Sequence, residues 1–169
     1  LLEDPWSYYA GCTPEANHEL MLRAYVKSYG ITGENLEKLN IALAQISVKN
    51  HLNALKNEYA QYQRKITVEQ VLEARKAARR PLGLYDFAPI SDGATAVILA
   101  SEDIAKKLTD KPVYVLGSAS ATDYLTYPSR EDLTGFVASR LAMEKALKMA
   151  GIGLCDIQIL EVYDQSTVM

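Results

Sequence analysis

The apolar residues of this chain follow two patterns, and the change between them lies near residue 83. Before it, apolar side chains recur at spacings of three and four residues, which predicts amphipathic helices over residues 13–29, 32–55 and 67–80. After it come short continuous apolar runs, which are typical of strands buried on both faces. The pattern therefore predicts a helical part, residues 1–83, followed by an α/β part.

Local signals mark the ends of the predicted helices. Thr13 followed by Pro14 is typical of a helix start, and Gly30 suits the position just after a helix. Thr67 and Gln70 have the spacing of a capping box. The first helix is expected to bury a stripe that includes Leu20, Met21, Ala24 and Tyr25.

The second part is organised around the run of small and apolar residues from Ala94 to Ala100, which predicts a buried strand. Ser101 then caps a short helix that ends near Leu108. Two more strands are expected, over residues 113–117 and 156–163. A helix over about residues 131–150 would connect them in a right-handed crossover. Because three strands are too few for a sheet covered on both faces, we expect the other strands to come from elsewhere in a longer chain.

Composition and charge narrow the class of partner. The chain has 169 residues, of which 49% are hydrophobic and 23% charged, with a net charge of −3. A slightly acidic protein is a poor match for nucleic acid or an anionic membrane surface. Two cysteines, at positions 12 and 155, form no disulfide framework, so we expect a reducing cytoplasm.

Few residues carry chemistry that the pattern alone can identify. His18 and His51 have no ligand at metal spacing, so structural or surface roles are favoured for both. Cys12 precedes a helix start, where a thiol can become nucleophilic, although a structural role is favoured here too. The basic cluster Arg75, Lys76, Arg79 and Arg80 suits either the C-terminus of a helix or a site for phosphate groups.

Residues 89–102, PISDGATAVILASE, resemble the [NS]DGAAAVVLAS segment of the thiolase superfamily, particularly of archaeal acetyl-CoA acetyltransferases and sterol-carrier-protein-type thiolases. Other segments resemble the same family in the same order along the whole chain: WSYYAG at 6–11, VKNH at 48–51, ITVE at 66–69, LTDKPVY at 108–114 and EVYD at 161–164.

The resemblance implies a layered α/β/α fold, present in part, with a helical insertion. Residues 1–83 would be the helical loop domain inserted in the N-terminal half of a thiolase. Residues 84–110 would supply the last strand and helix of that half, and residues 111–169 the start of the C-terminal half. The family's nucleophilic Cys segment has no counterpart here, so an internal fragment of this extent is expected to be inert alone.

The resemblance also implies site residues. Tyr163 and Asp164 occupy the place where sterol-carrier-type thiolases have a catalytic His-Asp pair. A tyrosine there departs from that pattern and suits thiolase-like aldolases, in which a phenol can act as acid or base; simple packing of Tyr163 is the third interpretation. Phe87 and Ala88 match the pantetheine side of the CoA site, and Arg79 and Arg80 are candidates for the CoA phosphates.

The function implied is that of an acyl-CoA acetyltransferase, either an acetyl-CoA C-acetyltransferase or a 3-ketoacyl-CoA thiolase. The alternatives are an aldolase that cleaves β-hydroxyacyl-CoA and a non-catalytic subunit of the lipid-transfer type. The substrate would be a coenzyme A thioester, with no separate cofactor and no metal. The partners implied are a second copy in a dimer or tetramer, a zinc-ribbon and OB-fold companion, and hydroxymethylglutaryl-CoA synthase.

Overall fold

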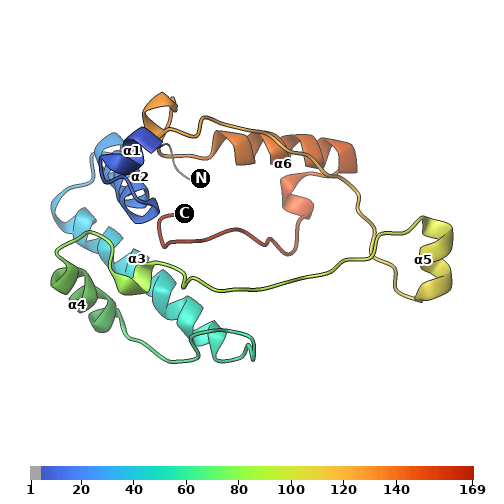
Figure 1. Ribbon diagram of the computed structural model, residues 1–169, viewed down its shortest axis with the longest axis horizontal. Coiled ribbons are helices and arrows are strands. Elements are labelled where there is room, and N and C mark those ends of the chain that lie inside the picture. Colours follow the sequence, from blue (N-terminus) through green and yellow to red (C-terminus); the bar gives the residue numbers. More distant parts are fainter. Residues whose placement is uncertain (1–4) are drawn as a thin grey trace. The chain divides into compact units, whose positions relative to one another are not determined.

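The computed structural model of the chain describes residues 5–169, so residues 1–4 of the predicted helical part lie outside the described residues. Its helices are, in order, α1 (Pro5–Tyr9), α2 (Pro14–Ser28), α3 (Gly33–Ala54), α4 (Val68–Ala78), α5 (Glu102–Leu108) and α6 (Val137–Ala150) (Figure 1). Three short 3₁₀ turns complete the set: η1 (Leu84–Asp86), η2 (Tyr127–Ser129) and η3 (Leu154–Asp156).

The chain divides into two compact units that interleave along the sequence. The first unit comprises the described part of residues 1–90 together with residues 123–136 and 161–169. The second comprises residues 91–122 and 137–160. The first unit contains α1 to α4.

Three of the predicted helix signals act as expected, whereas Ser101 precedes α5 without a side-chain cap hydrogen bond. The Thr13 hydroxyl accepts a hydrogen bond from Ala16 N, and Gly30 adopts a φ of 58° just after α2, a left-handed conformation that glycine adopts without strain. Thr67 and Gln70 form the complete capping box at the start of α4. These signals were sufficient because each satisfies backbone groups locally.

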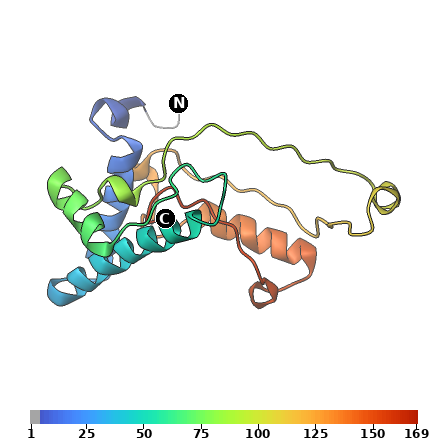
Figure 2. The same ribbon diagram turned by 90° about the horizontal axis from the view of Figure 1, so that it is seen from below.

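Helices α3 and α4 lie side by side in both views (Figures 1 and 2), and two small clusters of apolar residues fix them. In one cluster Leu22 of α2 packs with Leu43 of α3 and with Leu82, with Leu39 and Ile46 at its edge. In the other, Ala44 of α3 packs with Ile66 and Val71. The core of the first unit therefore consists of three helices and the segment after α4.

The buried face of α2 differs from the predicted stripe. Met21 is buried as expected, but Leu20 and Tyr25 are exposed, and Asn17 and His18 are buried in their place. The buried face of α2 is therefore rotated relative to its most apolar face. Periodicity alone could not have identified His18 as an interior residue.

A buried ion pair joins α4 to the segment that follows it. Arg75 donates from Nε to Asp86 Oδ2 at 2.8 Å and from Nη2 to Asp86 Oδ1 at 2.6 Å. Its third donor, Nη1, binds the backbone oxygen of Asn40 in α3 at 2.8 Å. Both side chains are almost fully buried, so each charge depends on its partner and on hydrogen bonds from the protein instead of on water.

The predicted α/β fold class is wrong for the described residues. Among residues 5–169 there is no strand, and the backbone forms only an isolated antiparallel bridge between Phe87 and Ser166. The predicted strand at Ala94–Ala100 is extended chain without sheet partners (Figure 1), and its Val97 and Ile98 are 80% and 89% exposed. Residues 113–117 and 157–163 are likewise outside any sheet.

The physical reason is that an apolar run indicates only that the segment would be stable if it were buried. It does not provide the neighbouring strands and layers that would bury it. A strand buried on both faces needs hydrogen-bonded neighbours on each side and covering layers above and below. None of the described residues provides them for Ala94–Ala100. The layered α/β/α arrangement is therefore absent from residues 5–169.

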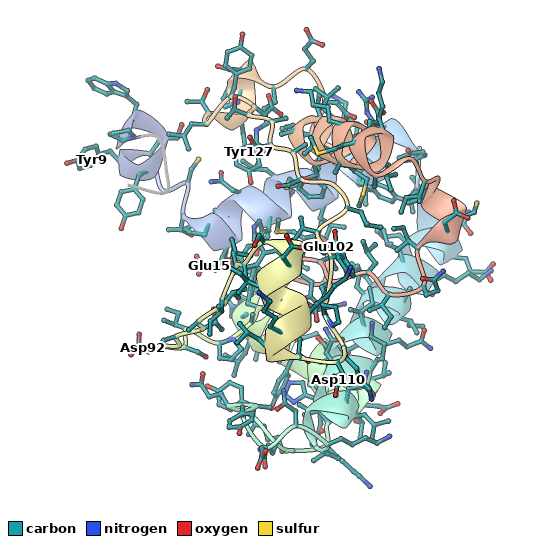
Figure 3. The ribbon with its side chains drawn as sticks, turned by 90° about the vertical axis from the view of Figure 1, so that its right-hand side faces the viewer. Tyr9, Glu15, Asp92, Glu102, Asp110 and Tyr127 are labelled. Carbon is teal, nitrogen blue, oxygen red and sulfur yellow. The ribbon has the colours of Figure 1, made fainter. Side chains whose placement is uncertain are left out.

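The second unit contains both predicted helices: α5 has the predicted extent, whereas α6 is shorter than predicted. Glu102, labelled in Figure 3, lies in the first turn of α5. Helix α6 begins at Val137, later than expected, because Asp132 Oδ1 accepts hydrogen bonds from both Thr134 N at 2.7 Å and Thr134 Oγ1 at 2.6 Å. Such an aspartate turn competes with the helix for the backbone. No helix of the described residues has the length and apolar content to cross a membrane.

Replacing Arg75 with Met tests the buried ion pair. The substitution leaves the Asp86 carboxylate buried without its cation, so we expect the free energy of unfolding to fall by about 3–5 kcal/mol in urea denaturation. The matched control is Lys38→Met, which removes an exposed pair with Glu34 in α3 and should cost less than about 0.5 kcal/mol. Equal losses for the two variants would contradict a dominant role for Arg75.

Candidate functional site

The first unit contains a cavity of about 890 Å³, whose three main walls are completed by Glu15 of α2 and by Ala78 and Arg80 at the end of α4. The C-terminal part of α3 and the loop after it form one wall. Residues 82–90, which follow α4, form a second, and residues 164, 166 and 167 contribute a third. A cavity of this size is in the range that holds a cofactor-sized ligand.

The wall at residues 82–90 is held by Asp86. Gly83 N donates to Asp86 Oδ2 at 2.7 Å, which closes the tight turn of η1. A Cβ at Gly83 would lie 2.9 Å from the backbone nitrogen of Arg75, so only glycine fits against α4 here. The neighbouring Leu82 is fully buried. Backbone packing therefore fixes where this wall leaves the helix.

The same carboxylate anchors the C-terminal wall. Thr167 Oγ1 donates to Asp86 Oδ1 at 2.9 Å, and Thr167 N donates to the backbone oxygen of Asp86 at 2.9 Å. Ala88 N donates to Gln165 O at 2.8 Å, beside the bridge between Phe87 and Ser166. These bonds place residue 164 at the cavity, although it is far from residues 82–90 in the sequence.

Four of the six residues proposed from the sequence line this cavity: Arg80, Phe87, Ala88 and Asp164. Asp164 Oδ2 accepts a hydrogen bond from Asn50 Nδ2 of α3 at 3.2 Å. Tyr163 and Arg79 are not among the lining residues, and the Tyr163 side chain is 75% exposed. The roles given to all six residues remain predictions.

The basic cluster at the end of α4 separates into residues with different surroundings. Arg75 is buried in the ion pair with Asp86. Arg80 Nε binds Glu19 Oε1 of α2 at 2.8 Å, at the edge of the cavity. Arg79 ends the helix in the left-handed conformation, with φ 53°, and is exposed. The interpretation of this cluster as charges that stabilise the C-terminus of a helix therefore applies to only some of its residues.

Sequence reasoning missed a second group of lining residues, in which Arg64 lies among aromatic rings. The guanidinium carbon of Arg64 is 5.7 Å from the ring centre of Tyr62 and 5.4 Å from that of Tyr85. His51 meets the Tyr85 ring edge-on at 5.9 Å, and its Nδ1 lies 3.2 Å from Arg64 O. The polar and aromatic composition of residues 57–65 is the available signal, but by itself it predicts only a loop.

Arg64 is the cavity cation without an acidic partner. Among the described residues, no carboxylate lies within ion-pair distance of Arg64, whereas Arg80 is paired with Glu19. A guanidinium held between rings keeps its planar fork oriented while its donors stay accessible. The cavity thus has a cationic wall at Arg64 and an acidic group at Asp164.

Glu15, in the first turn of α2, also lines the cavity and is held in its charged form. Hydrogen bonds from its own backbone N–H and, to a lesser degree, from the Thr13 hydroxyl lower the pKa of the Glu15 carboxyl. Burial opposes this shift only weakly. The α2 side of the cavity is therefore acidic.

Cys12 lies outside this cavity. It lines a smaller one of about 180 Å³ in the same unit, together with Leu20 and Tyr127. No described His or Lys is among the residues that line it, so the surroundings that would activate a nucleophilic thiol are missing from its lining.

Comparison with known proteins identifies the family. The chain is 41% identical over 162 residues to an acetyl-CoA acetyltransferase of Methanothermobacter thermautotrophicus, covering 96% of this chain and 40% of that protein. It is 36% identical over 132 residues to sterol carrier protein 2 of Gallus gallus, covering 72% of this chain and 23% of that protein. The chain belongs to the thiolase superfamily.

A solved structure supports the same membership. The thiolase-superfamily chain matches a structure named "Ltp2-ChsH2(DUF35) aldolase" with a TM-score of 0.77 and 27% identity, over 93% of this chain and 40% of that one. No family model matches. The chain thus spans about 40% of the length of the archaeal relative and of this structure.

The anchoring of the C-terminal wall can be tested at Thr167. Thr167→Val keeps the shape of the side chain but removes the hydrogen bond to a buried carboxylate, so the free energy of unfolding should fall by about 1.5–3 kcal/mol. Thr167→Ser keeps the hydroxyl and should lose about half of that or less. Urea unfolding of both variants measures the difference, and equal losses would mean that the hydroxyl does not anchor this wall.

Proposed function

We propose that this chain provides the binding cavity for a coenzyme A thioester in a thiolase-superfamily enzyme, and that the enzyme is an acetyl-CoA acetyltransferase. One observation carries the proposal: a single cavity collects Phe87, Ala88, Arg80 and Asp164, four residues chosen from the sequence for CoA binding or catalysis. The names of the archaeal relatives support the choice of acetyl-CoA over other acyl donors.

The phosphates of the ligand would bind at Arg64. Its guanidinium is oriented by the rings of Tyr62 and Tyr85 and has no carboxylate partner among the described residues. A guanidinium fork binds phosphate oxygens through paired N–H donors. Arg80 is a weaker candidate than the sequence suggested, because Glu19 already neutralises it.

The pantetheine arm would lie along residues 87–90. Phe87, Ala88, Pro89 and Ile90 give this wall an apolar surface next to the C-terminal segment. The small side chain of Ala88 leaves room for a narrow chain, while Ala88 N is already bound to Gln165 O. An apolar groove with a charged end suits a ligand that has an uncharged arm and a phosphate-bearing head.

The reacting end of the ligand would lie towards Asp164. Asn50 holds the carboxylate of Asp164 at the cavity. Tyr163 precedes it and exposes its phenol, which can donate a hydrogen bond to a thioester oxygen on which negative charge develops. The nucleophilic thiolate of an acetyltransferase is not assigned to any residue of this chain. That the 169 residues alone are inert stays a prediction.

Arg64 offers a direct test of the binding role. Arg64→Met should weaken CoA affinity by about tenfold to a hundredfold, because a charge-assisted contact worth about 1.5–3 kcal/mol is lost. Isothermal titration with CoA measures the change. Arg23→Met, an exposed arginine of α2 outside the cavity lining, is the matched control and should bind normally.

A parallel Arg79→Met variant tests the phosphate role predicted from the sequence. If Arg64→Met binds as well as Arg23→Met while Arg79→Met loses affinity, the phosphates bind at the end of α4 instead.

A second function has specific support. The matched solved structure is named an aldolase, and Tyr163 stands where the resembling thiolases have histidine. In a retro-aldol step, a base takes the proton of the β-hydroxyl, the bond between the α and β carbons breaks, and its electron pair moves into the thioester as an enolate. The phenol of Tyr163, the residue that precedes Asp164, would then return a proton to the α carbon.

Replacing Tyr163 with Phe separates the two reactions. In the full-length protein, Tyr163→Phe should lower retro-aldol turnover of a β-hydroxyacyl-CoA by about 10²-fold or more if the phenol transfers the proton. Thiolytic exchange between acetyl-CoA and CoA should fall less, since the phenol would there supply one hydrogen bond among several. Full aldol turnover in the variant would exclude Tyr163 as the acid or base.

Partners remain proposals. The name of the matched structure pairs Ltp2 with ChsH2(DUF35), which supports a companion protein for this chain as well. The zinc-ribbon and OB-fold identity of the companion, hydroxymethylglutaryl-CoA synthase as a further partner, homo-oligomers and a cytoplasmic location rest on the resemblance. The non-catalytic, lipid-transfer-type subunit is the third alternative, and sterol carrier protein 2 is among the relatives.

A further inference from the structure

His18 is an interior residue with an unexplained polar atom. Its side chain is 4% exposed, and Nδ1 is buried without a hydrogen-bond partner among the described residues. A buried polar group that lacks a partner costs free energy, so its retention calls for a role. An apolar ring of similar size would fill the same space without this cost.

The contact that His18 makes leads to the cavity. Its ring stacks on Phe87, with ring centres 6.0 Å apart and planes inclined by 18°. Phe87 is a lining residue, and it forms the bridge to Ser166 that joins two of the cavity walls. His18 itself is not a lining residue, so it acts on the cavity through Phe87.

The charged groups around His18 come from each neighbouring element. On α2, Glu15 lies one turn before it and lines the cavity (labelled in Figure 3), and Glu19 follows it directly and is paired with Arg80 from the end of α4. In the segment that carries Phe87, the charge of Asp86 is taken up by Arg75. Among these groups, Glu15 is therefore the one whose negative charge favours a protonated His18.

We propose that His18 is a positioning residue for the cavity: its neutral ring holds Phe87 in the wall, and protonation of His18 in weak acid releases that wall and lowers the affinity of the cavity for its ligand. The effect on affinity rests on the proposed function, namely CoA binding. The movement of Phe87 does not depend on it.

The direction of the proposed pH effect follows from the burial of His18. Desolvation, the larger effect, lowers the pKa of His18, and the Glu15 carboxylate opposes it. Because the buried ring resists a proton that it would accept in water, acid favours arrangements in which His18 reaches solvent. The closed wall is thus stable above the ordinary histidine range and is lost as the pH falls through the lowered pKa of His18.

The composition of the chain makes a direct measurement simple. It contains two phenylalanines, Phe87 and Phe136, and two histidines, His18 and His51. In protein labelled with 4-fluorophenylalanine, the fluorine resonance of Phe87 should titrate with the pKa of His18. The resonance of Phe136 is the internal reference and should move little. A Phe87 resonance that follows His51, or does not titrate, would overturn the proposal.

Two variants separate the proton from the packing. His18→Phe keeps an aromatic ring against Phe87 but cannot titrate, so the pH dependence of the Phe87 signal should disappear. The variant has a third fluorine resonance, from residue 18, which is recognised by its absence from the wild-type spectrum. His51→Gln removes the other imidazole, which does line the cavity, and should leave that dependence intact. If His18→Phe does not fold, the wild-type titration compared with His51→Gln still decides the assignment.

The ligand test uses dephospho-CoA, since its phosphodiester charges do not change in this pH range. Between about pH 7.5 and about pH 5.5, the affinity of wild-type protein should fall at least about fivefold, and that of His18→Phe should fall less than about twofold. The same fall in both proteins would overturn the effect on affinity. If dephospho-CoA does not bind at the higher pH, the proposed function fails, and the fluorine titration alone decides whether His18 controls Phe87.

Discussion

The buried ion pair between Arg75 and Asp86 is the interaction on which the rest of the first unit depends. The Asp86 carboxylate accepts four hydrogen bonds, two from Arg75 and one each from Gly83 and Thr167. Through these bonds one carboxylate connects α4, the wall after it and the C-terminal segment. Burying a charge is costly unless it is paired and fully hydrogen-bonded, so the need to bind the Asp86 carboxylate constrains the positions of Arg75, Gly83 and Thr167.

The candidate site follows from this constraint. The wall at residues 82–90 and the segment at 164–167 are both tied to Asp86, so residues from distant parts of the sequence face one cavity. In the proposed function, the ligand would contact two kinds of group: the apolar residues of the fixed wall, and Arg64, which the loop after α3 places near the rings of Tyr62 and Tyr85. A rigid wall together with a cation on a loop suits a ligand that has an uncharged arm and a charged head.

Membership in the thiolase superfamily and the geometry of the cavity answer different questions. In the proposed function, family membership limits the substrates to CoA thioesters, whereas the residues of the site decide which reaction of the family takes place. Tyr163 and Asp164 are the residues at which those reactions would differ. Near neutral pH a tyrosine phenol is neutral, whereas the histidine imidazole of the resembling thiolases can gain or lose a proton. His18 does not line the cavity, and its ring stacks on the lining residue Phe87, which is the contact that carries the proposed effect of pH.

The sequence alone determined the features that depend on near neighbours: the Thr13 and Thr67 caps, the stop at Gly30, and the family motif at residues 89–102. Each is satisfied within a few residues, so short-range pattern is sufficient. Tertiary structure decided what required distant partners. The strand predicted at Ala94–Ala100 has no neighbour to pair with among the described residues. The burial of His18, the pairing of Arg75 with Asp86 and the place of Arg64 in the cavity wall depend on contacts that no local pattern encodes.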